Sequence, residues 1–410
     1  MQKHLHKSSV LNNQTISITG SKSESNRALL LQALYPAIQI ENLSNSDDTQ
    51  LMQAAFKNQS GLVDIHHAGT AMRFLTAYFA TRSESDVILT GSSRMKERPI
   101  KILVEALRSL GSEISYLETE GCPPLKIKGK SITEKEVELK ADVSSQYISA
   151  LLLIAPSLNN GLKLTLKGKI TSVPYIKMTL ALLNEIGVKT NFEENVIEVE
   201  PFNEVQIETD TLVIESDWSS VSYFYSIVAL SKVGTKLQLS SYKKDSLQGD
   251  SVLAEIYKEF GVETTFIDNA IILNKIEDVN DDTIINLDLS NAPDIAQTIA
   301  VTAFGHGIGC DLTGLHTLKI KETDRLVALK TELEKLGAKV HITDDSLQLF
   351  ASKKIKEDIA IDTYKDHRMA MAFAPLALRV PITINEHDVV SKSYPDFWTD
   401  LEKIGIKSKE

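Results

Sequence analysis

A sequence pattern that recurs about every 75 residues constrains the fold of this chain more than any other feature. Five segments with apolar residues at helical spacing end in a glycine, at Gly111, Gly187, Gly261, Gly337 and Gly405. Successive glycines lie 76, 74, 76 and 68 residues apart. Glycine is favoured directly after a helix because it adopts a left-handed backbone without strain. Unrelated amphipathic helices can also end in this way, but the even spacing favours an internal repeat.

The length of the repeat indicates what each copy can be. A unit of about 75 residues is too long for a solenoid repeat and suits a small subdomain of helices and strands. An alternating strand pattern follows each of the first four glycines. Five to six such units fit in 410 residues, and a hydrophobic content of 42% is sufficient for two domains with sizeable cores.

The amino-acid composition limits the kinds of molecule that this chain can bind and the compartment that suits it. The net charge of -11 argues against nucleic acid and anionic membrane surfaces. We find no apolar run of membrane-spanning length and no signal-peptide pattern at the start. The only two cysteines, Cys122 and Cys310, imply no disulfide framework and fit a reducing, cytoplasmic setting. An anionic ligand would need a local cluster of cations, because the chain as a whole repels it.

The most informative short segment is Lys321-Glu322-Thr323-Asp324-Arg325, which we expect to open a helix over residues 321–336. Lys321 and Arg325 would then lie on one helix face, next to Glu322. Two cations and a carboxylate at a helix N-terminus suit an anion that must also exchange a proton. On its own, such a segment is more often a surface network of salt bridges.

Five further segments are rich in hydrogen-bond donors, and most stand at expected strand-to-helix junctions. They are GSKSESNR from Gly20, AGTAMR from Ala68, RMKERP from Arg94, SSQ from Ser144 and DHRMAM from Asp366. Each of them alone could be a helix cap. Six in one chain are more than capping explains, so the sequence indicates a site that holds anions at several points.

Together these segments resemble the 5-enolpyruvylshikimate-3-phosphate synthase family. Their order also matches, and it includes four more motifs: SDDT from Ser46, SVPY from Ser172, PD at Pro293-Asp294 and KSYPDFW from Lys392. RMKERP, KETDR and DHRMAM are each fairly specific, and jointly and in order they are very specific. The resemblance extends from Gly20 to Trp398, which is nearly the whole chain.

The resemblance implies an α/β (α+β) fold with two domains, six repeated βαβαββ-like units, three per domain, and an active site in the interdomain cleft. Residues 21–216 would form the domain on the shikimate 3-phosphate side. Residues 1–20 and 217–410 would form a discontinuous second domain that carries Asp294, KETDR and DHRMAM. The family is generally monomeric and uses no cofactor and no metal. The close histidine groupings, His4-Leu5-His6 and His66-His67, have no further ligand nearby in the sequence.

The family transfers the enolpyruvyl group of phosphoenolpyruvate to the 5-hydroxyl of shikimate 3-phosphate and releases phosphate, in the shikimate pathway to chorismate and aromatic amino acids. By resemblance, shikimate 3-phosphate would contact Lys22, Ser23, Arg27, Ser144, Ser145, Gln146, Ser172, Asp294, Thr317 and Lys321. Phosphoenolpyruvate would contact Lys22, Gly69, Arg98, Gln146, Arg325, Arg368 and Lys392. Arginine suits this ligand because its planar fork pairs two oxygens at once.

The same resemblance implies the catalytic roles. Asp294 would accept the proton of the 5-hydroxyl, Glu322 would donate a proton to C3, and Lys22 would help phosphate to leave. Nearby cations and bound anions act on the protonation of Glu322 in opposite directions, and the sequence leaves the balance open. Asp366-His367 would support the site, although a purely structural role for His367 fits equally well.

Three positions depart from the family pattern. His67 and Phe74 stand where the family commonly has Asn and Pro, which leaves sensitivity to the inhibitor glyphosate open. Thr317 falls where many relatives carry Asn. Two alternatives also remain at this point. A UDP-N-acetylglucosamine enolpyruvyl transferase would have Asn, not Ser23, after Lys22 and a cysteine in the loop at residues 94–99. A non-catalytic phosphometabolite-binding protein would not need both Asp294 and Glu322.

Overall fold

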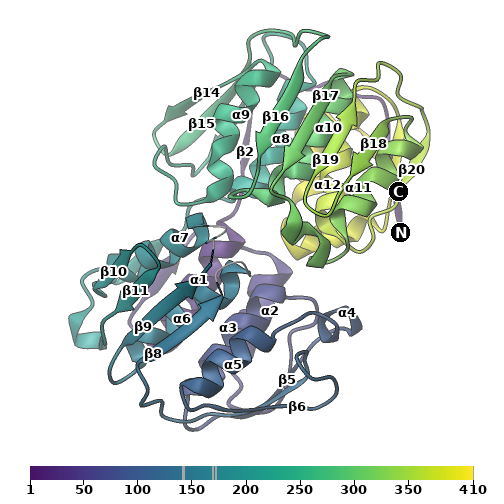
Figure 1. Cartoon of the computed structure of the whole chain (residues 1–410). Coiled ribbons are helices and arrows are strands. Elements are labelled where there is room, and N and C mark those ends of the chain that lie inside the picture. The colour runs from purple at the N-terminus through teal and green to yellow at the C-terminus, as the bar shows by residue number, and fades with distance from the viewer. Residues whose placement is uncertain (141–143, 169, 171–172, 410) are drawn as a thin grey trace. The chain divides into compact units, whose positions relative to one another are not determined.

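The computed structural model describes residues 1–140, 144–168, 170 and 173–409, which form two compact units (Figure 1). Unit 1 consists of residues 1–19 and 215–410, and unit 2 of residues 20–214. Each unit has its own hydrophobic core. Among the described residues, no helix combines the length and the apolarity needed to cross a membrane.

One sheet topology occurs five times in the described residues. Two parallel strands lie side by side, and an antiparallel pair of strands continues the sheet, as in the order β4-β5-β7-β6. The other orders are β8-β9-β11-β10, β2-β13-β15-β14, β16-β17-β19-β18 and β20-β21-β1-β22. A parallel pair needs a crossover connection, and helical segments supply it in four of the sheets. Between β2 and β13 the chain passes through unit 2 and then α8.

Unit 2 contains two of these sheets and a third, two-stranded one. Its strands are β3 (Gln39–Glu41), β4 (Ser60–Asp64), β5 (Asp86–Thr90), β6 (Glu113–Tyr116), β7 (Leu125–Lys128), β8 (Glu136–Lys140), β9 (Leu162–Lys167), β10 (Thr190–Glu193), β11 (Val196–Val199) and β12 (Thr211–Val213). Its helices are α1 (Lys22–Leu34), α2 (Asp47–Ala55), α3 (Gly69–Thr81), α4 (Ser93–Lys96), α5 (Lys101–Ser109), α6 (Ser145–Ile154) and α7 (Val173–Glu185), with 3-10 helices η1 (Ala155–Ser157) and η2 (Glu204–Gln206).

Unit 1 contains the other three sheets. Its strands are β1 (Gln2–Leu5), β2 (Gln14–Ser17), β13 (Lys236–Ser240), β14 (Val262–Ile267), β15 (Ala270–Lys275), β16 (Ile284–Asp288), β17 (Gly309–Thr313), β18 (Lys339–Ile342), β19 (Leu347–Phe350), β20 (Ile359–Ile361), β21 (Ile382–Asn385) and β22 (Ser408–Lys409). Its helices are α8 (Trp218–Ala229), α9 (Leu253–Ile256), α10 (Ala296–His306), α11 (Arg325–Lys335), α12 (His367–Phe373) and α13 (Phe397–Lys403). Its 3-10 helices are η3 (Gly249–Val252), η4 (Tyr257–Phe260), η5 (Pro293–Ile295), η6 (His316–Ile320), η7 (Ala374–Leu378) and η8 (His387–Lys392).

The first 19 residues belong to unit 1 because their strands complete two of its sheets. β1 pairs with β21 and β22, and β2 pairs with β13. In unit 2, the parallel pair β3 and β12 forms the two-stranded sheet of the sixth unit, which also has α1 and α2. The expected α/β fold with six repeated units is thus confirmed, with three sheets in each compact unit.

Helices α8, α10 and α12 form the centre of unit 1. α12 buries all seven of its residues, and α8 buries all of its residues except Ser219. Equivalent positions of successive repeats meet between α8 and α10. Ser222 lies 3.1 Å from Thr298, and Thr302 donates to Ser226 over 2.8 Å, and the residue numbers of the partners differ by 76 in both cases. The internal repeat therefore also appears in the contacts of the core.

The glycines that end the helical segments have the expected conformation. Gly111, Gly187, Gly261, Gly337 and Gly405 have φ angles of 104°, 101°, 68°, 104° and 95°. Each follows a helix of the structure and precedes a strand. A side chain would be strained at these angles, which explains the recurrence of glycine. The predicted helix ends are confirmed.

The predicted helix over residues 321–336 is wrong at its start. α11 begins at Arg325, and Asp324 is its N-cap, with a carboxylate oxygen that accepts hydrogen bonds from the backbone N–H groups of Leu326 and Val327, both 3.2 Å long. Lys321 has an extended backbone with φ -80° and ψ -150°. The capping bonds of Asp324 favour a later helix start than the run of charged residues suggests.

Candidate active site

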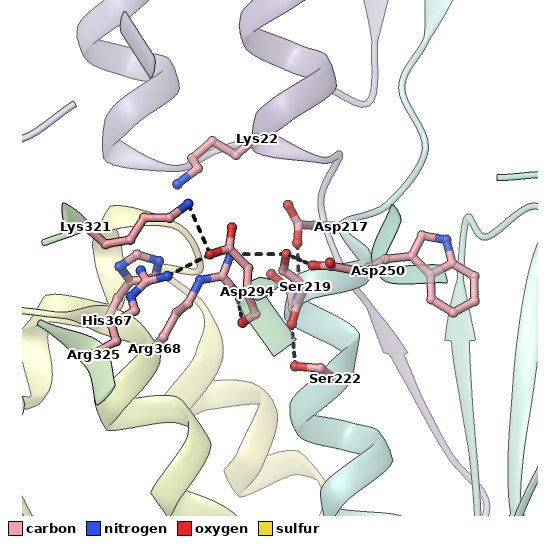
Figure 2. A network of polar contacts seen from close by, with 12 residues as sticks. Lys22, Asp217, Ser219, Ser222, Asp250, Asp294, Lys321, Arg325, His367 and Arg368 are labelled. Carbon is pink, nitrogen blue, oxygen red and sulfur yellow. Dashed lines mark hydrogen bonds and ion pairs between the residues drawn. The ribbon is translucent and has the colours of Figure 1, made fainter. Parts of the chain in front are cut away.

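Ionised side chains from separate segments of unit 1 meet around Asp294 (Figure 2). Asp294 lies in η5, directly before α10. Lys321 precedes α11, Arg325 opens α11, and Arg368 is the second residue of α12. The residues come together because the repeats place the starts of their helices on one side of the unit.

Arg325 is the centre of the ion-pair network. Its guanidinium is 2% exposed and donates to three carboxylates. Nε lies 2.7 Å from Asp366 Oδ2, Nη1 lies 2.7 Å from Asp294 Oδ1, and Nη2 lies 2.8 Å from Glu322 Oε2. Burial alone would lower the pKa of Arg325, but Asp366, Glu322 and Asp294 raise it above its usual value. This arginine holds its charge and fixes three acids in place.

Asp294 is surrounded by cations. Besides Arg325, its Oδ1 lies 3.3 Å from Lys321 Nζ, and its Oδ2 lies 3.4 Å from Arg368 Nη2. Burial opposes ionisation, but the charges of Lys321, Arg368 and Arg325 outweigh it and hold the pKa of Asp294 well below its usual range. Burial lowers the pKa of Lys321, and Asp294 partly offsets this. Asp294 is therefore ionised at neutral pH in the unliganded protein.

Glu322 and Lys392 form the other side of this network. Lys392 ends η8, is 5% exposed, and donates to Glu322 Oε1 over 2.6 Å. Glu322 accepts from a cation on each oxygen, because Arg325 reaches the second one. A carboxylate held by two cations in a half-buried position can exchange a proton if an anionic ligand takes over those cations.

Arg27, in α1 of unit 2, is held by neutral groups. It is 2% exposed and donates to the hydroxyls of Thr179 and Ser149, over 2.8 and 2.9 Å, and to the carbonyl oxygen of Ser23 over 2.7 Å. Burial lowers its pKa to about 10. The ring of Phe74 lies 5.4 Å from the guanidinium carbon. Phe74 is fully buried in α3, which still begins at Gly69.

Lys22 and His67 both lie near one buried carboxylate. Lys22 Nζ is 3.5 Å from Asp48 Oδ2, and His67 Nε2 is 3.9 Å from Asp48 Oδ1. Asp48 is 2% exposed and belongs to the first turn of α2. His67 Nε2 is also 4.0 Å from Asp47 Oδ2. The histidine that replaces the common Asn thus adds a titratable group next to the partner of Lys22.

Gly69 and Arg98 lie against each other. A Cβ atom on Gly69 would stand 2.4 Å from Arg98 Nη1, so only glycine leaves this guanidinium in place. Arg98 is 9% exposed, and no carboxylate partner is recorded for it among the described residues. Gln146, in α6, donates to Thr70 Oγ1 over 3.1 Å and so links the starts of α6 and α3. A buried arginine without a carboxylate partner is suited to an anion.

The remaining predicted site residues occupy helix starts as well. Ser144 is the N-cap of α6, and Ser145 is its buried first residue. Ser23 is half-buried in the first turn of α1. Thr317 lies in η6, and its buried hydroxyl has no hydrogen-bond partner in the part of the chain that the structure describes. Ser172 lies outside the described residues.

Several residues of these networks were missed by the sequence reasoning or given no role there. Ser219, Asp250, Thr179 and Ser149 have no local signal, because their partners lie 30 to 152 residues away. Asp366 was assigned only a supporting role. It caps α12 as Asp217 caps α8, and the internal repeat could have related these two N-caps, which are 149 residues apart.

Comparisons with known proteins decide the family. The sequence model of EPSP synthase (3-phosphoshikimate 1-carboxyvinyltransferase) matches residues 55–401. The chain belongs to the EPSP synthase family. The 3-phosphoshikimate 1-carboxyvinyltransferase of Bacteroides fragilis (strain YCH46) is 44% identical over 406 residues, with 96% of each chain covered. The enzyme of that name from Haemophilus influenzae (strain PittGG) is 37% identical and covers 96% of this chain and 97% of the relative.

Solved structures agree with the family's fold. EPSP synthase from Acinetobacter baumannii superposes with a TM-score of 0.80 at 20% identity, with 100% of this chain and 99% of that chain covered. The enolpyruvyl transferase NikO from Streptomyces tendae gives a TM-score of 0.76 at 13% identity, with 100% and 98% covered. At these identities the likeness establishes the fold alone.

Proposed function

We propose that this chain catalyses the reaction for which its family is named. The enolpyruvyl group of phosphoenolpyruvate is transferred to the 5-hydroxyl of shikimate 3-phosphate, and phosphate is released. The observation that carries the proposal is the network around Asp294 and Glu322. Two carboxylates with different surroundings share one buried arginine, which is an arrangement that supports separate acid and base roles.

The cations of unit 1 can bind an anion because its oxygens can replace the protein oxygens to which these cations donate. Arg368 and Lys392 donate to protein oxygens over 2.6 to 3.4 Å in the unliganded protein. The carboxylate and phosphate of phosphoenolpyruvate would replace some of these oxygens. In unit 2, Arg98, Gly69 and Gln146 would bind the same ligand, and Lys22 would assist the departure of phosphate.

The base and the acid have separate tasks. Asp294 is ionised and can accept the proton of the 5-hydroxyl, but its cations make it a weak base. An anionic ligand that neutralises Lys321 and Arg368 would raise the pKa of Asp294 and strengthen it as a base. Glu322 would take up a proton from solvent when phosphoenolpyruvate draws Lys392 away from it, and it would then donate this proton to C3. Bound substrate thus strengthens Asp294 as a base and allows Glu322 to act as an acid.

Shikimate 3-phosphate would be held mainly by neutral donors and buried cations. The proposed contacts are Lys22, Ser23, Arg27, Ser144, Ser145, Gln146, Ser172, Asp294, Thr317 and Lys321. Four hydrogen bonds hold Arg27 in one position, so its remaining N–H group is directed before a phosphate arrives.

We further propose that the two compact units are the two domains of the enzyme and that the chain acts as a cytoplasmic monomer. Cys122 and Cys310 are both free thiols, which supports a reducing compartment. Light scattering on the purified protein tests the oligomeric state, and a dimer mass would overturn the monomer.

The function is tested by phosphate release from phosphoenolpyruvate with shikimate 3-phosphate as acceptor. UDP-N-acetylglucosamine serves as the parallel acceptor. We expect release only with shikimate 3-phosphate. Release only with the sugar nucleotide would assign the chain to the related transferase, and release with neither would identify a binding protein or another acceptor.

A further inference from the structure

Asp250 is a buried carboxylate for which the proposed reaction has no role. It lies in η3, and 3% of its surface is exposed. Its Oδ2 accepts a hydrogen bond from the Ser219 hydroxyl (Figure 2). Its Oδ1 is shielded from solvent and has no hydrogen-bond partner among the described residues. A buried carboxylate oxygen without a partner is costly when charged, so it is a favourable place for a proton.

Ser219 connects Asp250 to the anion-binding cations. Arg368 Nη2 donates to Ser219 Oγ over 3.2 Å, and the same nitrogen lies 3.4 Å from Asp294 Oδ2. The serine hydroxyl has one proton, and it is donated to Asp250. A lone pair of the serine oxygen is therefore directed at Arg368. The ionised Asp250 holds Arg368 in position through one intervening hydroxyl.

Three charged groups face Asp250 and act on its ionisation in opposite directions. Asp217, at the N-cap of α8, and Asp294, in η5, repel a further negative charge, whereas Arg368, on α12, attracts it. The side chain of Gln248, which precedes η3, is neutral and bonds to the backbone of Trp218 and Ser216. Burial is the largest influence and raises the pKa of Asp250 to about 6.

We propose that Asp250 is a positioning residue that takes up a proton when an anion binds at Arg368. The inference rests on the proposed function, in which Arg368 holds phosphoenolpyruvate. A bound anion adds repulsion at Asp250 and takes over the charge of Arg368, so both changes favour the neutral acid. One proton passes from solvent to Oδ1 on binding, and it returns to solvent when phosphate leaves. Arg368 is held ready in the empty site and is released toward its ligand by this protonation.

Calorimetry in buffers of different ionisation enthalpy measures this proton uptake. Phospholactate, a saturated analogue of phosphoenolpyruvate that cannot transfer an enolpyruvyl group, is titrated at about pH 6.5 in the presence of shikimate 3-phosphate. The Asp250→Asn variant binds the same ligand, so the ligand's own titration cancels in the comparison. We expect the unsubstituted protein to take up roughly half a proton more per site than this variant.

Two matched variants separate charge from structure. Asp400→Asn changes another buried aspartate of unit 1, which pairs with Lys403 and Tyr394, and should leave the proton uptake unchanged. Ser219→Ala keeps the Asp250 carboxyl but removes the acceptor of Arg368. Because the Ser219 hydroxyl stabilises the ionised Asp250, we expect Ser219→Ala to take up fewer protons on binding. We also expect it to raise KM for phosphoenolpyruvate roughly three- to tenfold, with little change in kcat.

The outcomes distinguish this inference from the proposed function. If the unsubstituted protein turns over its substrates but takes up no more protons than Asp250→Asn, the role of Asp250 is overturned. If it does not turn over, the function itself fails. Infrared difference spectra give an independent answer. The C=O band of a protonated carboxylic acid should be stronger in the unsubstituted protein than in Asp250→Asn on binding of phospholactate, and equal bands in the two proteins would also overturn the proposal.

Discussion

The buried arginines of the candidate site are held in different ways in the two compact units. In unit 1, Arg325 binds Asp366, Asp294 and Glu322, and the neighbouring Lys392 binds Glu322 as well. In unit 2, the recorded partners of Arg27 are two hydroxyls and two backbone carbonyls, and no carboxylate partner is recorded for Arg98 among the described residues.

The difference indicates two tasks. A cation supported by neutral groups keeps its full charge for a ligand, and this suits a phosphate that is held but not altered. Cations paired with carboxylates attract an anion less strongly, but each carboxylate that they release can exchange a proton. We therefore infer that unit 2 serves mainly to hold anions, whereas the carboxylates of unit 1 serve proton transfer.

The largest expected effect is a loss of folding stability, and it should distinguish an arginine that is paired with carboxylates from one that is not. Arg325→Met leaves three carboxylates without their shared counter-charge, so we expect the free energy of unfolding to fall by about 3–5 kcal/mol. Arg98→Met removes no recorded carboxylate pairing and should cost less than about 1 kcal/mol, while it raises KM for phosphoenolpyruvate strongly. Urea unfolding measures both. Equal losses of stability in the two variants would contradict the claimed difference between the arginines of the two units.

A second pair of variants should change stability in opposite directions within unit 1. The lowered pKa of Asp294 stabilises the folded state above the unfolded pKa near 3.8, and this contribution is lost as pH falls through the folded pKa. The raised pKa of Asp250 has the reverse effect, because its contribution is present below 3.8 and is lost as pH rises through about 6.

At pH 7 we therefore expect Asp294→Asn to lower the free energy of unfolding by about 2–4 kcal/mol and Asp250→Asn to raise it by about 1–2 kcal/mol. At about pH 4.5 the gain from Asp250→Asn should largely disappear, while the loss from Asp294→Asn remains. Thermal and urea unfolding at the two pH values check this. A gain from Asp250→Asn that does not depend on pH would contradict the charge argument.

The smallest expected effect on stability comes from a substitution in unit 2. In Gly69→Ala, the new Cβ would stand 2.4 Å from Arg98 Nη1 and must displace that guanidinium. We expect KM for phosphoenolpyruvate to rise by about tenfold, with a change in stability below about 1 kcal/mol. Arg98→Lys is the matched background, because a lysine presents no guanidinium at that position. If Gly69→Ala has the same effect in both backgrounds, Arg98 does not mediate it.

Much of the fold was predictable because its signals are local and repeated. The glycines at 111, 187, 261, 337 and 405 lie in a left-handed conformation that a side chain would strain, so each recurs where a helix ends. Their spacing predicted five to six repeats, and the family resemblance implied six. The start of α11 was not predictable in this way, because the charged run from Lys321 resembles a helix start, whereas the capping bonds of Asp324 set the first helical residue at Arg325.

The candidate site was predictable only where a motif carries it. The motifs identified Asp294, Glu322, Arg325 and Arg368 as site residues, and these roles stay predictions until they are tested. Ser219 and Asp250 belong to no motif, and their connection depends on contacts between segments 31 and 149 residues apart. Such contacts follow from packing rather than from local pattern.

The most direct test of the account is turnover by Glu322→Gln. The variant keeps the shape and the hydrogen-bonding capacity of Glu322 but cannot donate a proton as an acid. We predict that kcat falls by about 10²–10⁴, while calorimetric affinities for shikimate 3-phosphate and phospholactate stay within a few-fold. The exposed Glu334→Gln, in the following helix α11, is the control and should keep full activity. Turnover of Glu322→Gln within a few-fold of the unsubstituted protein would contradict the proton-transfer role of unit 1.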